Sequence, residues 1–244
     1  MLGRKAALHD PRTLQLANYS AELPTPPSYA NYTKKVSTWP MYSNDTIGDC
    51  TIAAAGHLIQ DWTANDGHQV TIADADVITA YTAVSGYNPT TGANDNGANE
   101  IDVLNYWKKT GIGGHTIGAY TALQPKDENH IKSAVSIFAG CYIGLNMPIS
   151  AQTQRIWSVP PGGAVGQGAP GSWGGHAVPV VGYNATYLLV VSWGAIYKMT
   201  WQFWLAYCEE AYAILSHDLL NGTEKAPDGF DLAQLTADLA LVKN

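Results

Sequence analysis

The stretch that decides the fold is Gly175-His176-Ala177-Val178-Pro179-Val180-Val181-Gly182-Tyr183. Its apolar, β-branched residues favour a buried strand, and a second run of this kind follows at 187–193. A short connection, Asn184-Ala185-Thr186, separates the two runs, so the sequence predicts a β-hairpin. His176 begins the first strand directly after a Gly- and Pro-rich loop at 158–175, which leaves room beside its ring.

The pattern before the hairpin is mainly helical. Apolar spacing predicts helices at 50–62, 72–84 and 100–110, with a turn-rich loop at 85–99. A helix at 127–139, a strand at 141–147, an aromatic helix at 200–210 and a strand at 212–219 are also expected. Helices first and strands second indicate an α+β fold with two lobes, at about 39–125 and 126–222.

Cys50 lies at the start of the first predicted helix, with Asp49 as the expected N-cap. The free N–H groups and the dipole of a helix N-terminus stabilise a thiolate, which is the reactive form of cysteine. A thiolate nucleophile also needs an imidazole that exchanges protons with it, and His176 is the candidate. The two residues therefore predict acyl transfer through Cys50.

Three motifs carry a family resemblance. The run Asn44-Asp45-Thr46-Ile47-Gly48-Asp49-Cys50 resembles the papain-like cysteine peptidase segment in which an amide side chain precedes the nucleophile by six residues. The run at 175–183 is similar to the family's His-Ala-Val…Val-Gly-Tyr strand, and Ser192-Trp193-Gly194 resembles its Asn-Ser-Trp-Gly box. The 126 residues between Cys50 and His176 also fit, so the chain resembles a divergent member over about residues 39–220.

The resemblance implies a papain-like two-lobed fold, with a helical N-terminal lobe and an antiparallel β C-terminal lobe. In that fold Asn44 would donate to an oxyanion beside the Cys50 backbone N–H, and Trp193 would shield the hydrogen bond of the histidine. The implied catalytic residues are Cys50, His176, Asn44 and Ser192, and the implied substrate-binding residues are Gly97, Asn99, Gly175 and Trp193. The resemblance implies no metal and no cofactor.

Three positions depart from the family pattern. Asn44 replaces a glutamine and is one methylene shorter, and Thr51 replaces the tryptophan that follows the nucleophile. The asparagine that orients the histidine is missing, because family spacing leads to Ser192 and alignment on Trp193 leads to Val191. A serine hydroxyl can still accept an N–H from the imidazole, so the third catalytic member is expected to be weakened.

Composition narrows the function classes. The chain of 244 residues has a net charge of -7 and no basic run, which excludes a nucleic-acid or anionic-membrane binder. No apolar run approaches 18 residues, so no membrane span is expected.

Three cysteines form neither a disulfide framework nor a zinc site, and Cys141 and Cys208 are expected to be buried, Cys208 in the aromatic helix. Without a signal peptide the expected location is cytoplasmic, with a virion as the alternative.

The domain organisation follows from these elements. Residues 1–38 are expected to form an extended leader, 39–222 the papain-like domain, and 223–244 a C-terminal amphipathic helix packed on that domain. The leader has two alternative positions, along the cleft between the lobes or over apolar surface on the back of the fold.

Two functions remain open at this point. The first is a thiol hydrolase that cleaves peptide or amide bonds of a peptide or protein substrate through an acyl-Cys50 intermediate. The second is a non-catalytic papain-fold structural or binding protein in a virus particle or another assembly, with itself or another chain as partner. The ordered set of motifs around Cys50 and His176 makes the first the leading hypothesis, whereas the missing asparagine and the aromatic, weakly charged composition favour the second.

Overall fold

The computed structural model describes residues 1–17 and 24–219. The helices are α1 (Cys50–Asn65), α2 (Asp74–Ser85), α3 (Glu100–Lys109), α4 (Glu128–Phe138) and α5 (Trp201–Tyr207). The strands are β1 (Ala30–Asn31), β2 (Ile117–Ala122), β3 (Cys141–Met147), β4 (Ile156–Trp157), β5 (Gly174–Tyr183), β6 (Tyr187–Ser192), β7 (Ala195–Thr200) and β8 (Cys208–Ser216). Three short 3-10 helices are η2 (Thr33–Lys35), η3 (Ile149–Thr153) and η4 (Gly166–Gly168).

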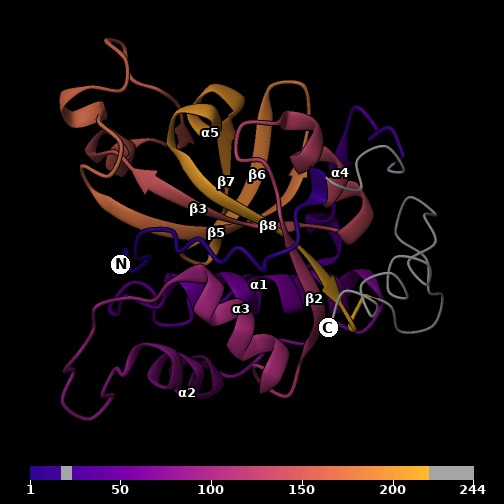
Figure 1. Cartoon of the computed structure of the whole chain (residues 1–244), viewed down its shortest axis with the longest axis vertical. Helices are drawn as coiled ribbons and strands as arrows, with labels where there is room; N and C mark the ends of the chain where they lie inside the picture. Colours follow the sequence, from indigo (N-terminus) through magenta and orange to yellow (C-terminus); the bar gives the residue numbers. More distant parts are fainter. Residues whose placement is uncertain (18–23, 220–244) are drawn as a thin grey trace.

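The strands form one sheet, and three helices gather on one side of it. The strand order is β2-β8-β3-β5-β6-β7-β4, and β1 pairs with β5 off this path. Figure 1 shows α1, α2 and α3 together below β3 and β5, whereas α5 lies beyond the sheet with β7. The α+β class predicted from the sequence is therefore confirmed, with a helical N-terminal part and a mainly antiparallel sheet after it.

Strand β5 lies in the interior of the sheet and carries the predicted hairpin. It pairs along its first part with all of β3, so that Leu145 faces His176, and it continues into β6 through the turn at 184–186. Val178, Val180 and Val181 are all buried, because the sheet and the helices cover both faces of the strand. The continuous apolar run that predicts this strand is thus explained by burial on both sides.

Helix α1 is buried from Cys50 to Ala64. Its small residues permit this close packing: a Cβ on Gly56 would come within 2.8 Å of the Tyr42 ring. Trp62 stacks on Trp107 of α3 with ring centroids 5.6 Å apart, and its Nε1 donates to a backbone carbonyl at 2.8 Å. This packing fixes the axis of α1 and hence the position of Cys50 at its first turn.

Some predicted elements are wrong in type or extent. The sequence reading missed β2 and β7, and it extended the aromatic helix to 210 although the helix ends at Tyr207. Cys208 therefore begins β8 and does not lie in a helix, because this segment pairs with β3 and β2. Such pairing overrides the local helical pattern of an aromatic stretch.

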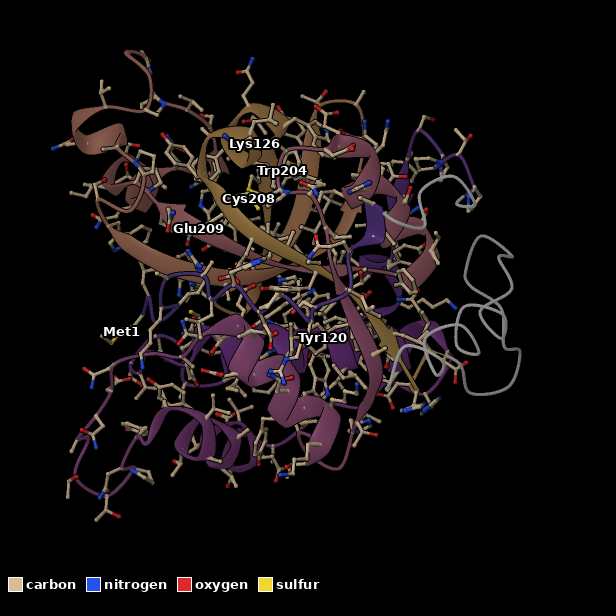
Figure 2. All side chains as sticks on the ribbon, viewed as in Figure 1. Met1, Tyr120, Lys126, Trp204, Cys208 and Glu209 are labelled. Carbon is tan, nitrogen blue, oxygen red and sulfur yellow. The ribbon has the colours of Figure 1, made fainter. Side chains whose placement is uncertain are left out.

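A β-bulge interrupts β8 where it meets β3. Gly144 pairs with Glu210 and Leu145 pairs with Cys208, so Glu209 is an extra residue on its strand. Figure 2 shows Cys208 and Glu209 next to each other on the sheet. A bulge lets adjacent side chains leave their normal alternation, and Glu209 and Glu210 both reach the Arg4 side chain.

The leader runs along two different parts of the domain. Its first seven residues, here called the inserted segment (1–7), pass between residues 97–99 and the start of β5, and Figure 1 shows this trace between the helices and the sheet. Farther along, β1 pairs with the opposite end of β5 at Gly182 and Tyr183. Residues 1–7 thus lie between the helices and the sheet, and residues 30–31 add a short strand beside β5. The helix expected within 223–244 lies outside the described residues.

Candidate active site

Cys50 is the first residue of α1, and only 1 % of its surface is exposed. Burial raises the pKa of the Cys50 thiol to about 11, although hydrogen bonds from the backbone N–H groups of Ala177 and Gly3 oppose this rise. Ala177 directly follows His176 on β5, and Gly3 belongs to the inserted segment. The thiol therefore lies between the sheet and the inserted segment, and it is protonated near neutral pH.

His176 is held on two sides by polar and aromatic contacts. Its Nε2 lies 2.7 Å from the Oγ of Ser192, the last residue of β6. Trp193 stacks on the imidazole with ring centroids 4.6 Å apart, and Trp157 meets the ring edge-on at 6.4 Å. The Nδ1 atom is buried and has no hydrogen-bond partner among the described residues. The ring is thus fixed in orientation with one nitrogen left over for a reaction partner.

Cys50 and His176 do not form an ion pair in this state. Because Nδ1 of His176 lacks a partner within the described part of the chain, no hydrogen bond joins it to the thiol. Burial lowers the pKa of His176 to about 3, so its imidazole is neutral over the physiological range. The site described here therefore contains a neutral thiol and a neutral imidazole.

Asn44 lies beside the start of α1 and donates three hydrogen bonds from Nδ2. The acceptors are the Oδ1 of Asp49 at 2.9 Å, the carbonyl of Met1 at 3.1 Å and the carbonyl of Ile47 at 3.3 Å. Asp49 occupies the N-cap position but makes no capping bond, so that expectation is wrong: its carboxyl group accepts from Asn44 instead. The Met1 carbonyl demonstrates that the Asn44 amide can hold a peptide oxygen at this place.

Backbone groups on both sides bind the inserted segment. The N–H of Ala98 donates to the Gly3 carbonyl at 2.8 Å, and the Ala98 carbonyl accepts from Lys5 at 2.9 Å. On the sheet side, the carbonyl of Gly175 accepts from the N–H of Arg4 at 3.0 Å. A side chain at Gly175 would collide with the Arg4 backbone, so this position requires glycine.

Two of the other three predicted substrate-binding residues also contact this segment, whereas Trp193 stacks on His176. Gly97 has a φ of +71°, and a Cβ there would collide with the carbonyl of Gly3. Asn99 donates from Nδ2 to the carbonyl of Ala6 at 2.6 Å. Residues 97–99 and Gly175 thus bind an extended peptide from two sides.

The contacts above bring Asn44, Gly97, Asn99 and Gly175 together around the inserted segment, whereas Ser192 and Trp193 contact His176. Sequence reasoning missed Ala98, because it binds through its backbone and no residue type signals that. It also missed Trp157, which packs against the His176 ring, and Arg4, whose guanidinium contacts Glu209 and Glu210. One feature of the sequence could have indicated the Arg4 contacts: two adjacent glutamates lie inside the mainly apolar, aromatic run 201–215.

Residues 1–17 and 24–219 contain neither a metal-binding cluster nor a membrane-spanning helix. No group of three or more histidine, cysteine or acidic residues there could hold a metal ion. No helix in the same part of the chain is long and apolar enough to cross a membrane.

Comparisons with known proteins agree on the fold. No protein-family model matches the chain, and no curated protein matches its sequence. Among solved structures, xylellain, a cysteine protease from Xylella fastidiosa, matches with a TM-score of 0.66 and 15 % identity, covering 88 % of this chain and 95 % of that one. Digestive procathepsin L 3 of Tenebrio molitor matches with a TM-score of 0.61 and 14 % identity over 87 % of this chain and 75 % of that one.

A third match is the Carica candamarcensis cysteine protease CMS1MS2, solved in complex with E-64. Its TM-score is 0.57 at 15 % identity, and the match covers 78 % of this chain and 98 % of that one. All three are papain-like cysteine proteases at low sequence identity. The chain therefore has the papain-like fold, as a divergent example of it.

Proposed function

We propose that this protein is a thiol hydrolase that cleaves peptide or amide bonds through an acyl-Cys50 intermediate. The observation that carries the proposal is the fixed imidazole beside the start of α1. Ser192 and Trp193 hold the His176 ring, and its Nδ1 has no partner among the described residues. The N–H of Ala177, the next residue, contacts the Cys50 thiol. A free imidazole nitrogen beside a thiol at a helix N-terminus is the arrangement that thiol nucleophiles need.

The proposed reaction uses these groups in order. Nδ1 of His176 takes the thiol proton, and the Cys50 sulfur attacks the substrate carbonyl carbon. The Asn44 amide and the Cys50 backbone N–H stabilise the oxyanion that forms. The imidazolium then protonates the leaving amine as the C–N bond breaks, and water hydrolyses the thioester, which restores the thiol.

The inserted segment holds this machinery in a closed state. It occupies the backbone donors and acceptors that a substrate would use, and it buries the thiol and the imidazole. Burial disfavours the thiolate and the imidazolium alike, so the segment must move before an ion pair forms. The proposed substrate is thus a peptide or protein that replaces residues 1–7.

A second candidate is a papain-fold binding or structural protein without catalysis. The observation in its favour is that serine stands where an asparagine would orient the histidine, beside a thiol and an imidazole that are both neutral. In this reading residues 1–7 are a permanent part of the domain and the protein acts through its surface.

The two candidates differ in one experiment. A Val side chain at position 3 would collide with the backbone of Gly48, so Gly3→Val displaces the inserted segment without touching a proposed catalytic group. Incubation of Gly3→Val with peptides from a denatured protein, followed by mass spectrometry, should reveal new peptide termini. Cys50→Ala in the same background should generate none. If Gly3→Val remains folded and yields no new termini, the hydrolase proposal fails and the binding protein stands.

A further inference from the structure

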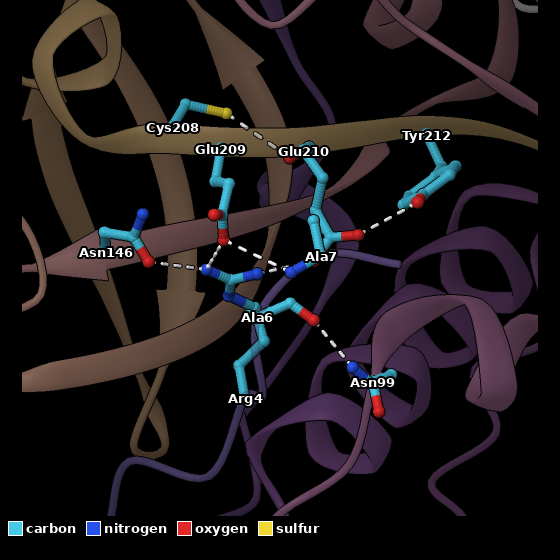
Figure 3. Close-up of polar contacts among 9 residues, drawn as sticks. All are labelled: Arg4, Ala6, Ala7, Asn99, Asn146, Cys208, Glu209, Glu210 and Tyr212. Carbon is cyan, nitrogen blue, oxygen red and sulfur yellow. Dashed lines mark hydrogen bonds and ion pairs between the residues drawn. The ribbon is translucent and has the colours of Figure 1, made fainter. Parts of the chain in front are cut away.

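The Arg4 side chain enters a buried acidic site, here called the Arg4 site, formed by Glu100, Asn146, Glu209 and Glu210. Only 1 % of the side chain is exposed. Its Nη1 contacts Glu210 Oε1 at 2.5 Å, and its Nη2 contacts Glu209 Oε2 at 2.5 Å and Asn146 Oδ1 at 2.8 Å (Figure 3). The acceptors therefore lie around both terminal nitrogens of one planar guanidinium.

This arrangement suits arginine better than lysine. Two carboxylates and an amide oxygen match the two Nη atoms of a guanidinium, whereas an ammonium presents a single nitrogen. Burial alone would lower the pKa of Arg4, but the charges of Glu100 and Glu209 outweigh it and raise the pKa. The site therefore supports a permanent positive charge away from water.

Glu100 gives an independent sign that the site is built for a ligand. Its side chain is fully buried, and neither carboxyl oxygen has a hydrogen-bond partner within the described residues. A Cβ on Gly144 would lie 2.7 Å from both Glu100 Oε1 and Arg4 Cδ, so the two side chains converge above a glycine of β3. The missing side chain at Gly144 provides the space through which a long aliphatic stem passes.

The Arg4 site lies next to the candidate active site. The backbone of Arg4 bonds to Gly175, directly before His176, and its neighbour Gly3 contacts the Cys50 thiol. A peptide that replaces the inserted segment between residue 98 and Gly175 would present its own side chain to the acidic site. Leaving the buried Glu100 and Glu210 without a cation is costly, so a replacement with a positive charge is favoured.

We propose that the Arg4 site recognises an arginine side chain of the peptide substrate, and that Arg4 is its built-in occupant. This inference rests on the proposed function, because the bound peptide is a substrate only if the protein is a hydrolase. Recognition of the arginine side chain is a binding property and can be measured without catalysis. Glu210 and Glu209 are the residues that select for arginine. The Glu210 side chain is buried, and about a third of the Glu209 side chain is exposed.

The test measures binding in a protein that cannot react. Gly3→Val combined with Cys50→Ala displaces the inserted segment and removes the nucleophile. Two fluorescent, end-blocked peptides are compared that differ only in arginine against citrulline, which has the same shape without the charge, and a lysine peptide serves as a third ligand. We expect the arginine peptide to bind at least about tenfold more tightly than the citrulline peptide. Glu210→Gln and Glu209→Gln should each reduce this preference.

The outcomes separate this inference from the proposed function. Equal binding of the arginine and citrulline peptides, in a variant whose melting temperature shows a folded domain, overturns the inference. An unchanged preference in both glutamine variants overturns it as well, and Glu209→Gln keeps the test valid if Glu210→Gln fails to fold. Arginine-selective binding without hydrolysis by Gly3→Val leaves the inference standing and removes the proposed function. Hydrolysis by Gly3→Val without a preference for the arginine peptide supports the proposed function and overturns the inference.

Discussion

The Nε2 of His176 and the Oγ of Ser192 lie 2.7 Å apart, and this hydrogen bond fixes the imidazole that Trp193 stacks upon. With the proton on Nε2, the lone pair of Nδ1 is free to act as a base. Serine thus occupies the orienting position where the papain-like pattern has an asparagine, and the contact expected between Ser192 and His176 is present.

Ser192→Ala should slow hydrolysis when it is introduced into Gly3→Val. A lost hydrogen bond of about 1 kcal/mol corresponds to roughly a fivefold lower kcat/KM, and an Asn at the same position should raise the rate. The measurement is kcat/KM on a peptide that Gly3→Val cleaves. Ser136→Ala is the matched control, because that serine is also buried and hydrogen-bonded but lies in α4. Equal rates for Ser192→Ala and Ser136→Ala would rule out an orienting role.

Gly3→Val should expose the Cys50 thiol. Displacing residues 1–7 admits water, removes the main cause of the raised pKa of Cys50, and increases its reactivity toward iodoacetamide at pH 7.5 by at least about tenfold. Mass spectrometry of the labelled cysteines reports the rate. Cys141 is the internal control, since it is buried in β3. Lys5→Ala, at an exposed side chain, should leave both rates unchanged. Equal Cys50 labelling in wild type and Gly3→Val would mean that residues 1–7 do not close the site.

Asp61→Asn should make the protein less sensitive to alkaline pH. Burial raises the pKa of Asp61 in α1 well above its usual value, and neither carboxyl oxygen has a partner among the described residues. The folded state therefore holds a proton that the unfolded state releases above about pH 4. The stability of the wild type falls as pH rises through this window, whereas the asparagine contributes no such loss.

Urea unfolding at pH 5 and pH 8 checks this sign. We expect the free energy of unfolding of Asp61→Asn, relative to wild type, to be higher at pH 8 than at pH 5 by about 1 kcal/mol or more. Asp45→Asn, at an exposed position, is the control and should show no such difference. A relative stability that falls with pH would contradict the assignment of a buried, protonated carboxyl group.

The sequence predicts the central part of this fold well, because long apolar runs leave few alternatives. Strand β3 was predicted with its observed ends, and the hairpin of β5 and β6 and the start of α1 also agree. These elements carry Cys50, His176 and Ser192, so the residues proposed for catalysis could be chosen before the structure was known.

The parts that the sequence does not reveal depend on pairing between distant segments. Residues 208–210 have the local pattern of an aromatic helix, and only their pairing with β3 makes them a strand with a bulge. Without the bulge, Glu209 and Glu210 would not face Arg4 together. Arg4 itself lies far away in sequence, and no local pattern connects it to two glutamates more than 200 residues later.

The pH dependence of Cys50 alkylation in Gly3→Val, compared with Gly3→Val combined with His176→Ala, tests most directly whether these two residues act as a pair. An imidazolium partner should make the thiolate available well below pH 8.5, the usual pKa of a lone cysteine, and His176→Ala should move the profile back toward that value. Identical profiles with and without His176 would contradict the pairing, because Cys50 would then have no imidazole partner.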